Sequence, residues 1–131
     1  MIVADTSALV AILRREPEAD AFSQRLAAAG RTYMSALSVF ETKVVLGGGR
    51  PTRTVRSFEA WLEADAVDVV PFDAAMADAA FAAYSRYGKG VHPHARLSFC
   101  DCAAYALARA LDAPLLFKGA DFRHTDVTPA V

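Results

Sequence analysis

LSFCDCAAYALARALDAPLLFKGADF, residues 97–122, is the stretch that decides the fold of this chain. Its pattern predicts a polar start, an almost wholly apolar helix, a break at Ala113-Pro114, a short strand and a glycine turn. A segment this apolar belongs in the middle of a domain, where an isolated carboxylate is costly. Asp101 nevertheless lies in the first turn of the predicted helix, and Asp121 lies just past the end of the predicted strand. Both acids therefore need hydrogen-bond partners or a cation.

The bulk composition indicates one globular domain spanning residues 1–131. Of the 131 residues 54% are hydrophobic, which is enough for a substantial core. No segment approaches the length of a membrane span, so we expect no membrane partner. The formal net charge of -1 gives no overall attraction to nucleic acid, so such binding must come from local clusters of arginine and lysine.

The start of the chain and its cysteines indicate a reducing compartment. The opening MIVAD lacks the basic region of a secretory signal. Cys100 and Cys102, the only cysteines, are too close in sequence for a disulfide. We therefore expect reduced thiols and a cytoplasmic location.

Outward from residues 97–122, short apolar runs alternate with helical patterns. Strands are predicted at residues 2–4, 31–35, 67–72 and 115–117, with a weak indication of another near residue 127. Helices are predicted over about residues 6–15, 17–28, 35–46, 51–65 and 74–87, besides the central one. The buried side of the helix at 74–87 is expected to carry Met76, Ala80, Phe81 and Tyr84. This alternation favours an α/β fold, a three-layer α/β/α sandwich with a mainly parallel central sheet.

Four acids are expected at one edge of that sheet. Asp5 and Asp121 follow predicted strands, Glu41 lies in the helix after the second strand, and Asp101 opens the central helix. Ligands of parallel sheets bind beyond the carboxyl ends of the strands. Clustered carboxylates repel one another unless a cation holds them. An all-oxygen set suits Mg²⁺ or Mn²⁺, which can support phosphodiester hydrolysis without a histidine base.

Each acid also has a purely structural explanation. Asp5 is well placed to cap the helix that begins at Thr6. Ser38-x-x-Glu41 and Ser98-x-x-Asp101 both resemble capping boxes, and Asp121 can close a turn after Gly119. It is the combination of the four that favours a metal site.

Basic residues suggest two places for a polyanion. Arg50, Arg53 and Arg56 fall three apart around Pro51, which predicts one side of a helix that either binds RNA phosphates or is simply solvated. The loop at 88–96 carries Lys89, His92, His94 and Arg96 and gains positive charge at lower pH, so it is a second candidate guide for RNA, with Lys89 and His92 as its contacts.

The order and spacing of these motifs resemble the PIN-domain ribonucleases, and among them the VapC toxins of bacterial toxin–antitoxin pairs. The resemblance is carried by Asp5 with Thr6-Ser7, by Glu41, and by the segments LSFCDCAAYALA and LLFKGADF, and it spans nearly the whole chain. It implies a PIN-like fold and a metal-dependent endoribonuclease that uses Mg²⁺ or Mn²⁺. It also implies a toxin that blocks translation or growth, with RNA as substrate and a cognate antitoxin as partner. Apolar surface left on the helices fits either a homodimer, which we expect, or a groove for an antitoxin helix.

The resemblance implies a role for each site residue. Asp5 and Asp101 would hold the primary metal ion, while Glu41 and Asp121 would bind through water or hold a second ion. Thr6 and Ser7 would be supporting polar groups. Two departures stand out: Cys100 occupies a place where glycine is common in these toxins, and Ala120 replaces a residue that is often polar or acidic.

Three rival functions are weaker. A non-catalytic PIN-like scaffold that binds RNA or protein does not need all four acids, and all four are present. A receiver-type signalling domain needs a pair of acids after the first strand, but Asp5 stands alone before Thr6-Ser7, and Asp73 lacks the expected companions. A phosphatase with an Asp-x-Asp motif fails because Ser7 occupies the second aspartate position.

Overall fold

A four-stranded parallel sheet runs through the centre of the computed structural model, which describes residues 1–131. The strands are β1 (Ile2–Ala4), β2 (Thr32–Ser35), β3 (Val67–Val70) and β4 (Leu115–Leu116). Their spatial order is β3-β2-β1-β4, so the two shortest strands, β1 and β4, lie side by side. Because all neighbours are parallel, every connection must cross over through helices.

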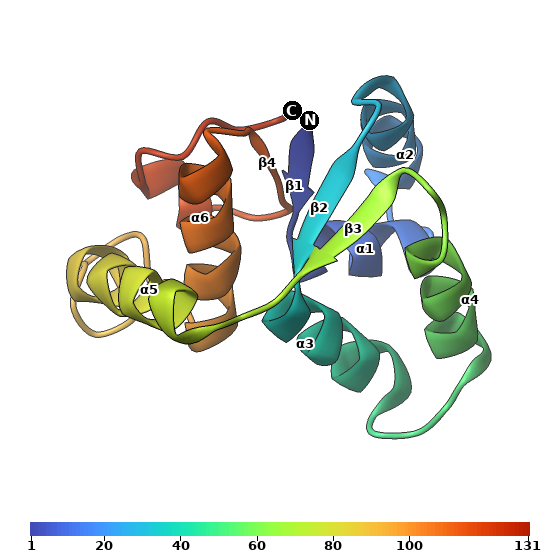
Figure 1. Ribbon diagram of the computed structural model, residues 1–131, viewed down its shortest axis with the longest axis horizontal. Helices are drawn as coiled ribbons and strands as arrows, with labels where there is room; N and C mark the ends of the chain where they lie inside the picture. The colour runs from blue at the N-terminus through green and yellow to red at the C-terminus, as the bar shows by residue number, and fades with distance from the viewer.

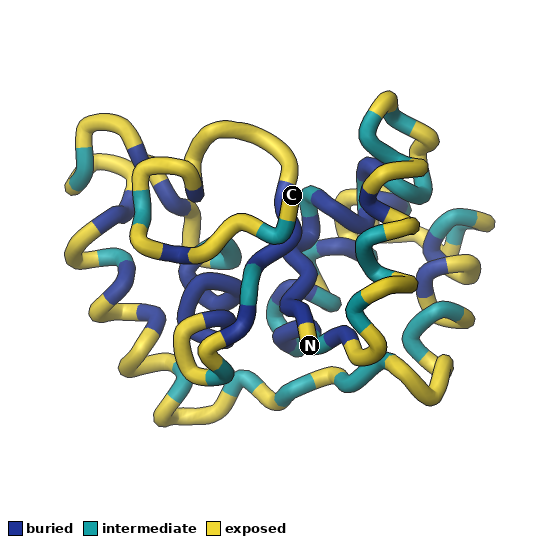
Figure 2. The backbone as a smooth tube through the Cα atoms, turned by 90° about the horizontal axis from the view of Figure 1, so that it is seen from above, coloured by how far each residue is buried: buried dark blue, intermediate teal, exposed yellow.

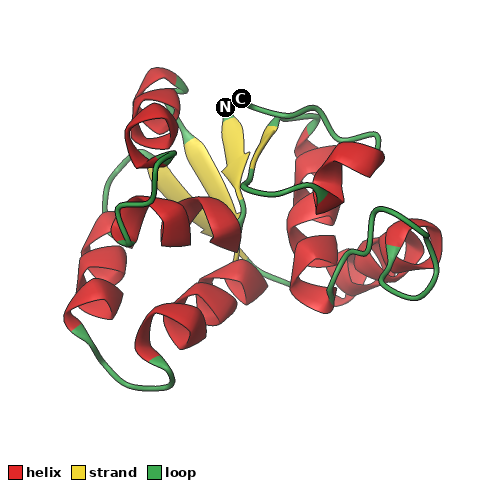
Figure 3. Cartoon of the chain, turned by 180° about the vertical axis from the view of Figure 1, so that it is seen from behind, coloured by secondary structure: helices red, strands yellow, loops and turns green.

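Helices cover both faces of this sheet, as Figure 1 and the view from behind in Figure 3 show. One face carries α5 (Ala74–Tyr87) and α6 (Phe99–Leu111). The other carries α1 (Thr6–Leu13), α2 (Ala19–Ala28) and α4 (Arg53–Leu62), while α3 (Ala36–Gly47) starts at the carboxyl end of β2 and extends away from the sheet. A short 3₁₀ helix, η1 (Asp121–His124), follows β4. The predicted three-layer α/β/α architecture is confirmed.

The two apolar cores follow from the alternation of side chains along each strand. Ile2 and Ala4 pack into the core beneath α1, α2 and α4, whereas Val3 between them packs into the core beneath α5 and α6. Leu115 and Leu116 divide in the same way. In Figure 2 the buried residues gather along the middle of the molecule. A strand that is buried on both faces reads as an unbroken apolar run, which is why IVA and LL appear so in the sequence.

Helix ends differ from the predicted ones where proline or serine misled the assignment. Pro17 lies in a turn and Pro51 in a loop, and the helices begin only at Ala19 and Arg53. Ser35 caps α3 by accepting from the Leu37 amide, so the predicted capping box at Ser38 is wrong. Ser38 is the third residue of α3, inside the first turn, and is fully buried.

The buried face of α5 also differs from the prediction. Ala80, Ala83 and Tyr87 are buried against α6, but Phe81 is 73% exposed. Spacings of three and four residues place 80, 83 and 87 on one side of the helix, so the intervening residue points elsewhere. Met76 and Tyr84 are partly buried against the core, as expected.

The C-terminal segment lies along β4 without forming a full strand. The Leu115 amide donates to the Thr128 carbonyl oxygen at 2.9 Å, and the Ala130 amide donates to the Leu115 carbonyl oxygen at 2.9 Å. These two bonds form an isolated parallel bridge between Leu115 and Pro129, and neither of them needs an amide hydrogen on Pro129. The two chain termini therefore lie close together, at the top of Figure 1. No helix in the structure has the length and hydropathy needed to cross a membrane.

One polar contact ties this C-terminal segment to α6. The Tyr105 hydroxyl donates to Asp126 Oδ1 at 2.5 Å, and this hydrogen bond, helped by the Arg109 and Arg86 guanidinium groups, lowers the pKa of Asp126. A carboxylate with a lowered pKa stabilises the fold above its ordinary pKa of 3.8, and that contribution is lost as the pH falls through the lowered value.

We therefore expect Tyr105→Phe to cost about 1 kcal/mol of unfolding free energy at neutral pH, since Asp126 is partly exposed to solvent. Urea unfolding should show that this cost shrinks once the pH is well below the ordinary aspartate pKa. Tyr84→Phe is the matched control, because the Tyr84 hydroxyl donates to the neutral Lys89 carbonyl oxygen. A Tyr105→Phe cost that does not change with pH would contradict the role given to the Asp126 carboxylate.

Candidate active site

Asp5 is the most constrained acid in the molecule. It follows β1, caps the N-terminus of α1, and is only 2% exposed. Its Oδ2 atom accepts from the Ser7 amide at 3.0 Å and from the Ser7 hydroxyl at 2.6 Å. Its Oδ1 atom is buried and has no hydrogen-bond partner. Capping the helix uses only the Oδ2 atom, so it does not explain why the Oδ1 atom is buried.

The charge on Asp5 is costly in the protein as it stands. Burial first, and then the negative charges of Asp101 and Glu41, raise the pKa of Asp5 to about 7, although the Ser7 hydrogen bonds act in the opposite direction. An ionised buried group in this setting needs a positive partner. No lysine or arginine side chain supplies one, since all six ion-pair contacts lie at other acids.

Asp101 is held in place by the start of α6. Its Oδ2 atom accepts from the Ser98 amide at 2.9 Å, and its own amide donates to the Ser98 hydroxyl at 3.2 Å, which confirms the predicted capping box. Burial raises the pKa of Asp101, the Ser98 contacts lower it, and the charge of Asp121 raises it further. Asp101 therefore serves as a cap while carrying a second oxygen that the capping box does not use.

Glu41 and Asp121 complete the group from two further elements. Glu41 is partly buried on α3, and Asp121 is exposed at the start of η1. Burial and the charges of Glu41, Asp101 and Asp5 together raise the pKa of the Cys100 thiol to about 12, so this thiol stays protonated among the acids. The tertiary structure thus brings Asp5, Glu41 and Asp101 together, with Asp121 beside Asp101.

The two predicted supporting residues have different surroundings. The Ser7 hydroxyl bridges the ends of two strands. It donates to Asp5, which follows β1, and accepts from the amide of Lys118, which follows β4, at 3.0 Å. Thr6 points away from the acids, and its hydroxyl donates to the Ser38 carbonyl oxygen at 3.1 Å. Thr42 contacts both Thr6 and Ser38, so this buried polar group joins α1 to α3. The contact from Lys118 has no signal in the sequence, because it is made by a backbone amide.

The acids suit a hard divalent cation that keeps part of its water shell. No three histidine, cysteine, aspartate or glutamate side chains are arranged as a ready-made metal cage. Mg²⁺ is usually held by one or two carboxylates plus waters, and it does not need such a cage. The unpartnered Oδ1 atom of Asp5 is the feature of this chain that most directly fits a cation.

The three arginines around Pro51 do not lie along one side of a helix, as the spacing had predicted. Arg50 precedes α4 and lines a hollow with Phe40 and Lys43, whereas Arg53 lines a different hollow between α1, α2 and α4. Arg56 turns back and donates to the Pro51 carbonyl oxygen at 2.8 Å. The helix begins after Pro51 rather than at it, so Arg50 never joins the helical spacing.

The predicted loop contacts do share a surface. Lys89 and His92 line one open hollow in the loop between α5 and α6, and Arg96 lines it with them. This loop leads directly into the Ser98–Asp101 cap.

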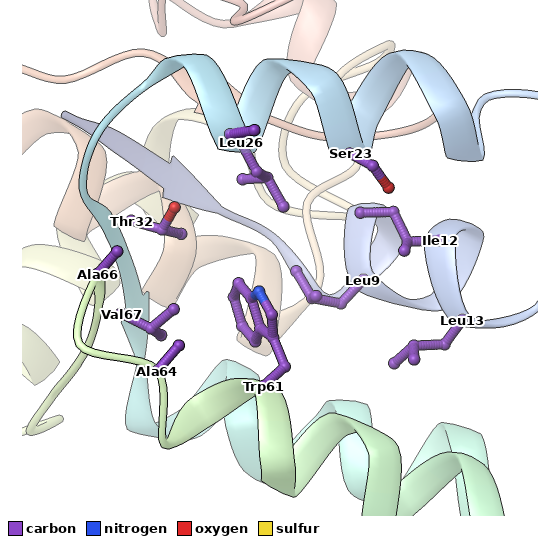
Figure 4. Close-up of a pocket in the computed structure, with 11 residues that line it drawn as sticks. Leu9, Ile12, Leu13, Ser23, Leu26, Thr32, Trp61, Ala64, Ala66 and Val67 are labelled. Carbon is purple, nitrogen blue, oxygen red and sulfur yellow. The ribbon is translucent and has the colours of Figure 1, made fainter.

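A separate, apolar hollow lies on the opposite side of the sheet. Figure 4 shows it between α1, α2 and α4, with Leu9, Leu26, Trp61 and Val67 around it. Its volume is about 350 Å³, and nine of its 11 lining residues are hydrophobic. Trp61 lines this hollow and is partly exposed.

Comparison with known proteins places this arrangement in a family. A family model described as "PIN domain" matches residues 2–127. The chain is 46% identical over 126 residues to ribonuclease VapC30 of Mycobacterium tuberculosis, which covers 96% of this chain and 95% of that protein. It is also 46% identical over 126 residues to a ribonuclease VapC of Mycolicibacterium smegmatis, covering 96% of this chain and 97% of that protein.

Two solved structures share the fold at low sequence identity. One is Mycobacterium tuberculosis VapC20, described as a Sarcin-Ricin loop cleaving toxin, with a TM-score of 0.79, 20% identity, and coverage of 98% of this chain and 97% of that one. The other is a toxin-antitoxin complex from Klebsiella pneumoniae, with a TM-score of 0.72, 18% identity, and coverage of 96% and 93%.

The raised pKa of Asp5 gives a prediction for the metal-free protein. A folded-state pKa above the ordinary value of 3.8 means that the folded protein holds its proton longer, so Asp5 destabilises the fold increasingly as the pH rises from 3.8 to about 7. Three pKa units correspond to at most about 4 kcal/mol. With EDTA present, we therefore expect Asp5→Asn to raise the unfolding free energy at pH above 7 by a few kcal/mol, and much less at acidic pH.

The control is Asp78→Asn, which removes an exposed carboxylate on α5. Added Mg²⁺ should raise the melting temperature of the parent protein more than that of Asp5→Asn. An Asp5→Asn protein that is less stable than the parent at high pH would contradict the electrostatic strain inferred for Asp5.

Proposed function

Because the chain belongs to the PIN-domain family, and within it to the VapC ribonucleases, we propose that it is a metal-dependent endoribonuclease and the toxin of a toxin–antitoxin pair that blocks translation or growth. The observation that carries the catalytic part is the Asp5 carboxylate, which is buried beside Glu41 and Asp101 with one oxygen unpartnered. Sequence identity to proteins named ribonucleases supports RNA as the substrate.

In this proposal Asp5 and Asp101 hold the primary Mg²⁺ or Mn²⁺, with Glu41 and Asp121 acting through water or holding a second ion. When bound there, the cation lowers the pKa of water and stabilises the charge that builds on a phosphodiester. Ser7 and Ser98 each hold one oxygen of their aspartate and leave the other oxygen for the cation. These two serines are therefore positioning residues.

The surrounding backbone reduces the repulsion among the acids. α1, α3 and α6 all begin at this edge, capped by Asp5, Ser35 and Ser98. The amino end of a helix carries partial positive charge, which favours nearby carboxylates and phosphates. The protonated Cys100 thiol adds no charge of its own, and it is not a nucleophile in this state.

Cleavage of an RNA panel, single-stranded and structured, tests the catalytic proposal. We expect cleavage with Mg²⁺ or Mn²⁺ and none with EDTA. Asp5→Asn and Asp101→Asn should each slow it by at least about a hundredfold, the range seen when a charge-stabilising group is removed. Glu41→Gln and Asp121→Asn should have smaller effects.

The matched control is Asp112→Asn at the other end of α6, where a left-handed backbone (φ 50°) tolerates asparagine. Full metal-dependent cleavage by Asp5→Asn would remove Asp5 from the site. If the folded, antitoxin-free protein cuts no RNA, a binding scaffold becomes the better assignment.

For the antitoxin we propose the apolar hollow around Trp61. A structural neighbour of this chain is a toxin-antitoxin complex, which supports a protein partner. A hollow lined mainly by hydrophobic side chains suits the apolar face of an amphipathic helix. It lies on the helical layer formed by α1, α2 and α4, whereas α6, which carries Asp101, covers the other face.

A second copy of the chain is proposed at a different surface. Phe40, Phe81 and Phe99 are 64%, 73% and 75% exposed on α3, α5 and α6. Beside Phe81 and Phe99 lies a second hollow of about 350 Å³, lined only by hydrophobic residues. In a two-fold dimer, the protruding aromatic side chains of each copy would fill the hollow of the other copy.

The only tryptophan of the chain reports on the antitoxin proposal, because Trp61 lines the hollow. Titration with the proposed cognate antitoxin should shift the Trp61 fluorescence to shorter wavelengths. Leu26→Glu should weaken binding at least about tenfold, while Ala60→Glu on the exposed side of α4 should not. Normal antitoxin binding by Leu26→Glu would rule out the hollow around Trp61 as the antitoxin site.

The homodimer has its own test. Sedimentation of the free chain at monomer mass would contradict it.

A further inference from the structure

The open hollow between α5 and α6 is a cationic site that the protein itself does not use. It is lined by Lys89, Gly90, Val91, His92, Pro93 and Arg96, and its volume is about 460 Å³. No carboxylate lines it, although the chain as a whole has a net charge of -1. Neither Lys89 nor Arg96 takes part in any of the six ion-pair contacts of the molecule.

The third polar side chain in the hollow is fixed as a donor. His92 Nδ1 accepts from the amides of His94, at 3.1 Å, and Ala95, at 2.9 Å. A neutral imidazole that accepts at Nδ1 carries its proton on Nε2, so His92 presents an N–H group. The same assignment excludes His92 as an ordinary metal ligand through Nε2.

The loop that carries these groups is held firmly. The amides of Val91 and His92 both donate to the Gly88 carbonyl oxygen, at 2.9 and 3.0 Å. The Lys89 amide donates to the Leu97 carbonyl oxygen at 2.9 Å, and the Tyr84 hydroxyl donates to the Lys89 carbonyl oxygen at 2.8 Å. A cationic hollow on a preformed loop loses little conformational entropy when it binds an anion.

The backbone of Arg96 is strained, and no contact of the Arg96 side chain within the protein accounts for that strain. Its φ is +55°, in the left-handed region that disfavours residues other than glycine. It is exposed, and its guanidinium has no partner in the protein. Strain of this kind is found where the position of a side chain matters for function. Two residues later, Ser98 begins the cap that holds Asp101.

The three histidines of the chain connect this hollow with the other flank of the acid site. The ring centroids of His92 and His94 are 6.2 Å apart, and those of His94 and His124 are 5.5 Å apart. His124 ends η1, whose first residue is Asp121. The loop before α6 and the turn after β4, which are distant in sequence, therefore meet at the short helix that begins with Asp121. The loop lies at the outer end of α5, at the right of Figure 3.

We propose that the hollow formed by Lys89, His92 and Arg96 binds a backbone phosphate of the RNA substrate, away from the scissile bond. The inference rests on the proposed ribonuclease function and adds where the RNA strand runs: from the acids, past His124 and His94, to the hollow. Phosphate contacts of this kind carry affinity and register but no base specificity.

The test measures RNA binding separately from cleavage. In the Asp5→Asn background, the affinity for a short labelled single-stranded RNA is measured by fluorescence anisotropy at several salt concentrations, with EDTA present. Each phosphate contact on a single strand contributes about 0.7 to the slope of log K against log salt. Because the hollow is proposed to hold one phosphate, Lys89→Gln with Arg96→Asn should reduce that slope by about 0.7, and each single substitution should reduce it by less. Asparagine at 96 tolerates the left-handed backbone.

The matched control is Arg15→Asn with Arg31→Gln, which lowers the net charge equally. Arg15 is exposed and is the other left-handed arginine of the chain (φ 53°), and Arg31 directly precedes β2, where it pairs with Asp68 on the surface. An unchanged slope in the hollow variant, or an equal fall in the control, would overturn the proposal. So would a hollow variant that binds RNA normally but no longer binds the antitoxin, because the hollow would then recognise an acidic protein segment.

The outcomes separate the two proposals. Metal-dependent cleavage together with an unchanged salt slope leaves the ribonuclease assignment standing and removes the hollow from the RNA path. Loss of RNA binding in the hollow variant of a protein that cuts no RNA keeps the phosphate site and removes the ribonuclease.

Discussion

The burial of the Asp5 carboxylate at the end of β1 is the constraint on which the site depends. A charged oxygen with no hydrogen-bond partner, placed beside two more carboxylates, works against folding. The fold tolerates it because the rest of the carboxylate is firmly held by Ser7, and because that serine is itself anchored by the backbone of the next strand. The buried Asp5 charge lowers the folding stability, and because that charge lacks a partner, a cation would be bound most strongly there.

The parallel sheet is what allows this concentration of charge. Each of its strands runs in the same direction, so the segments that follow them meet at one edge. Asp5 follows β1, Glu41 lies on the helix after β2, and Asp121 follows β4. Asp101 reaches the same edge from the start of α6. Helix N-termini gather there for the same topological reason, and they offset part of the repulsion.

Different surfaces around this edge have different chemistry. The hollow around Trp61 is apolar and lies under α1, α2 and α4, whereas the hollow around Arg96 is cationic and lies beyond α5. A protein helix and a nucleic-acid strand need these two environments respectively. Separate surfaces would let the chain bind a protein partner and a nucleic acid by unrelated contacts, and the net charge of -1 shows that the cationic character is local.

The sequence by itself determined the alternation of strands and helices, the parallel sheet and the positions of the four acids along it, because burial on both faces and helical spacing are local patterns. It also identified the Ser98–Asp101 cap, which needs only four consecutive residues. It failed at Ser38 and for the arginines around Pro51, where the helix begins one or two residues later than predicted. It also failed at Phe81, where the helix bounds were right but the buried face was not. Only the tertiary structure decided that Asp5 Oδ1 is left without a partner, that His94 meets His124, and that Lys89 and Arg96 make no ion pair. These facts depend on contacts between segments far apart in the chain, and no local pattern records which of the many distant groups will be neighbours.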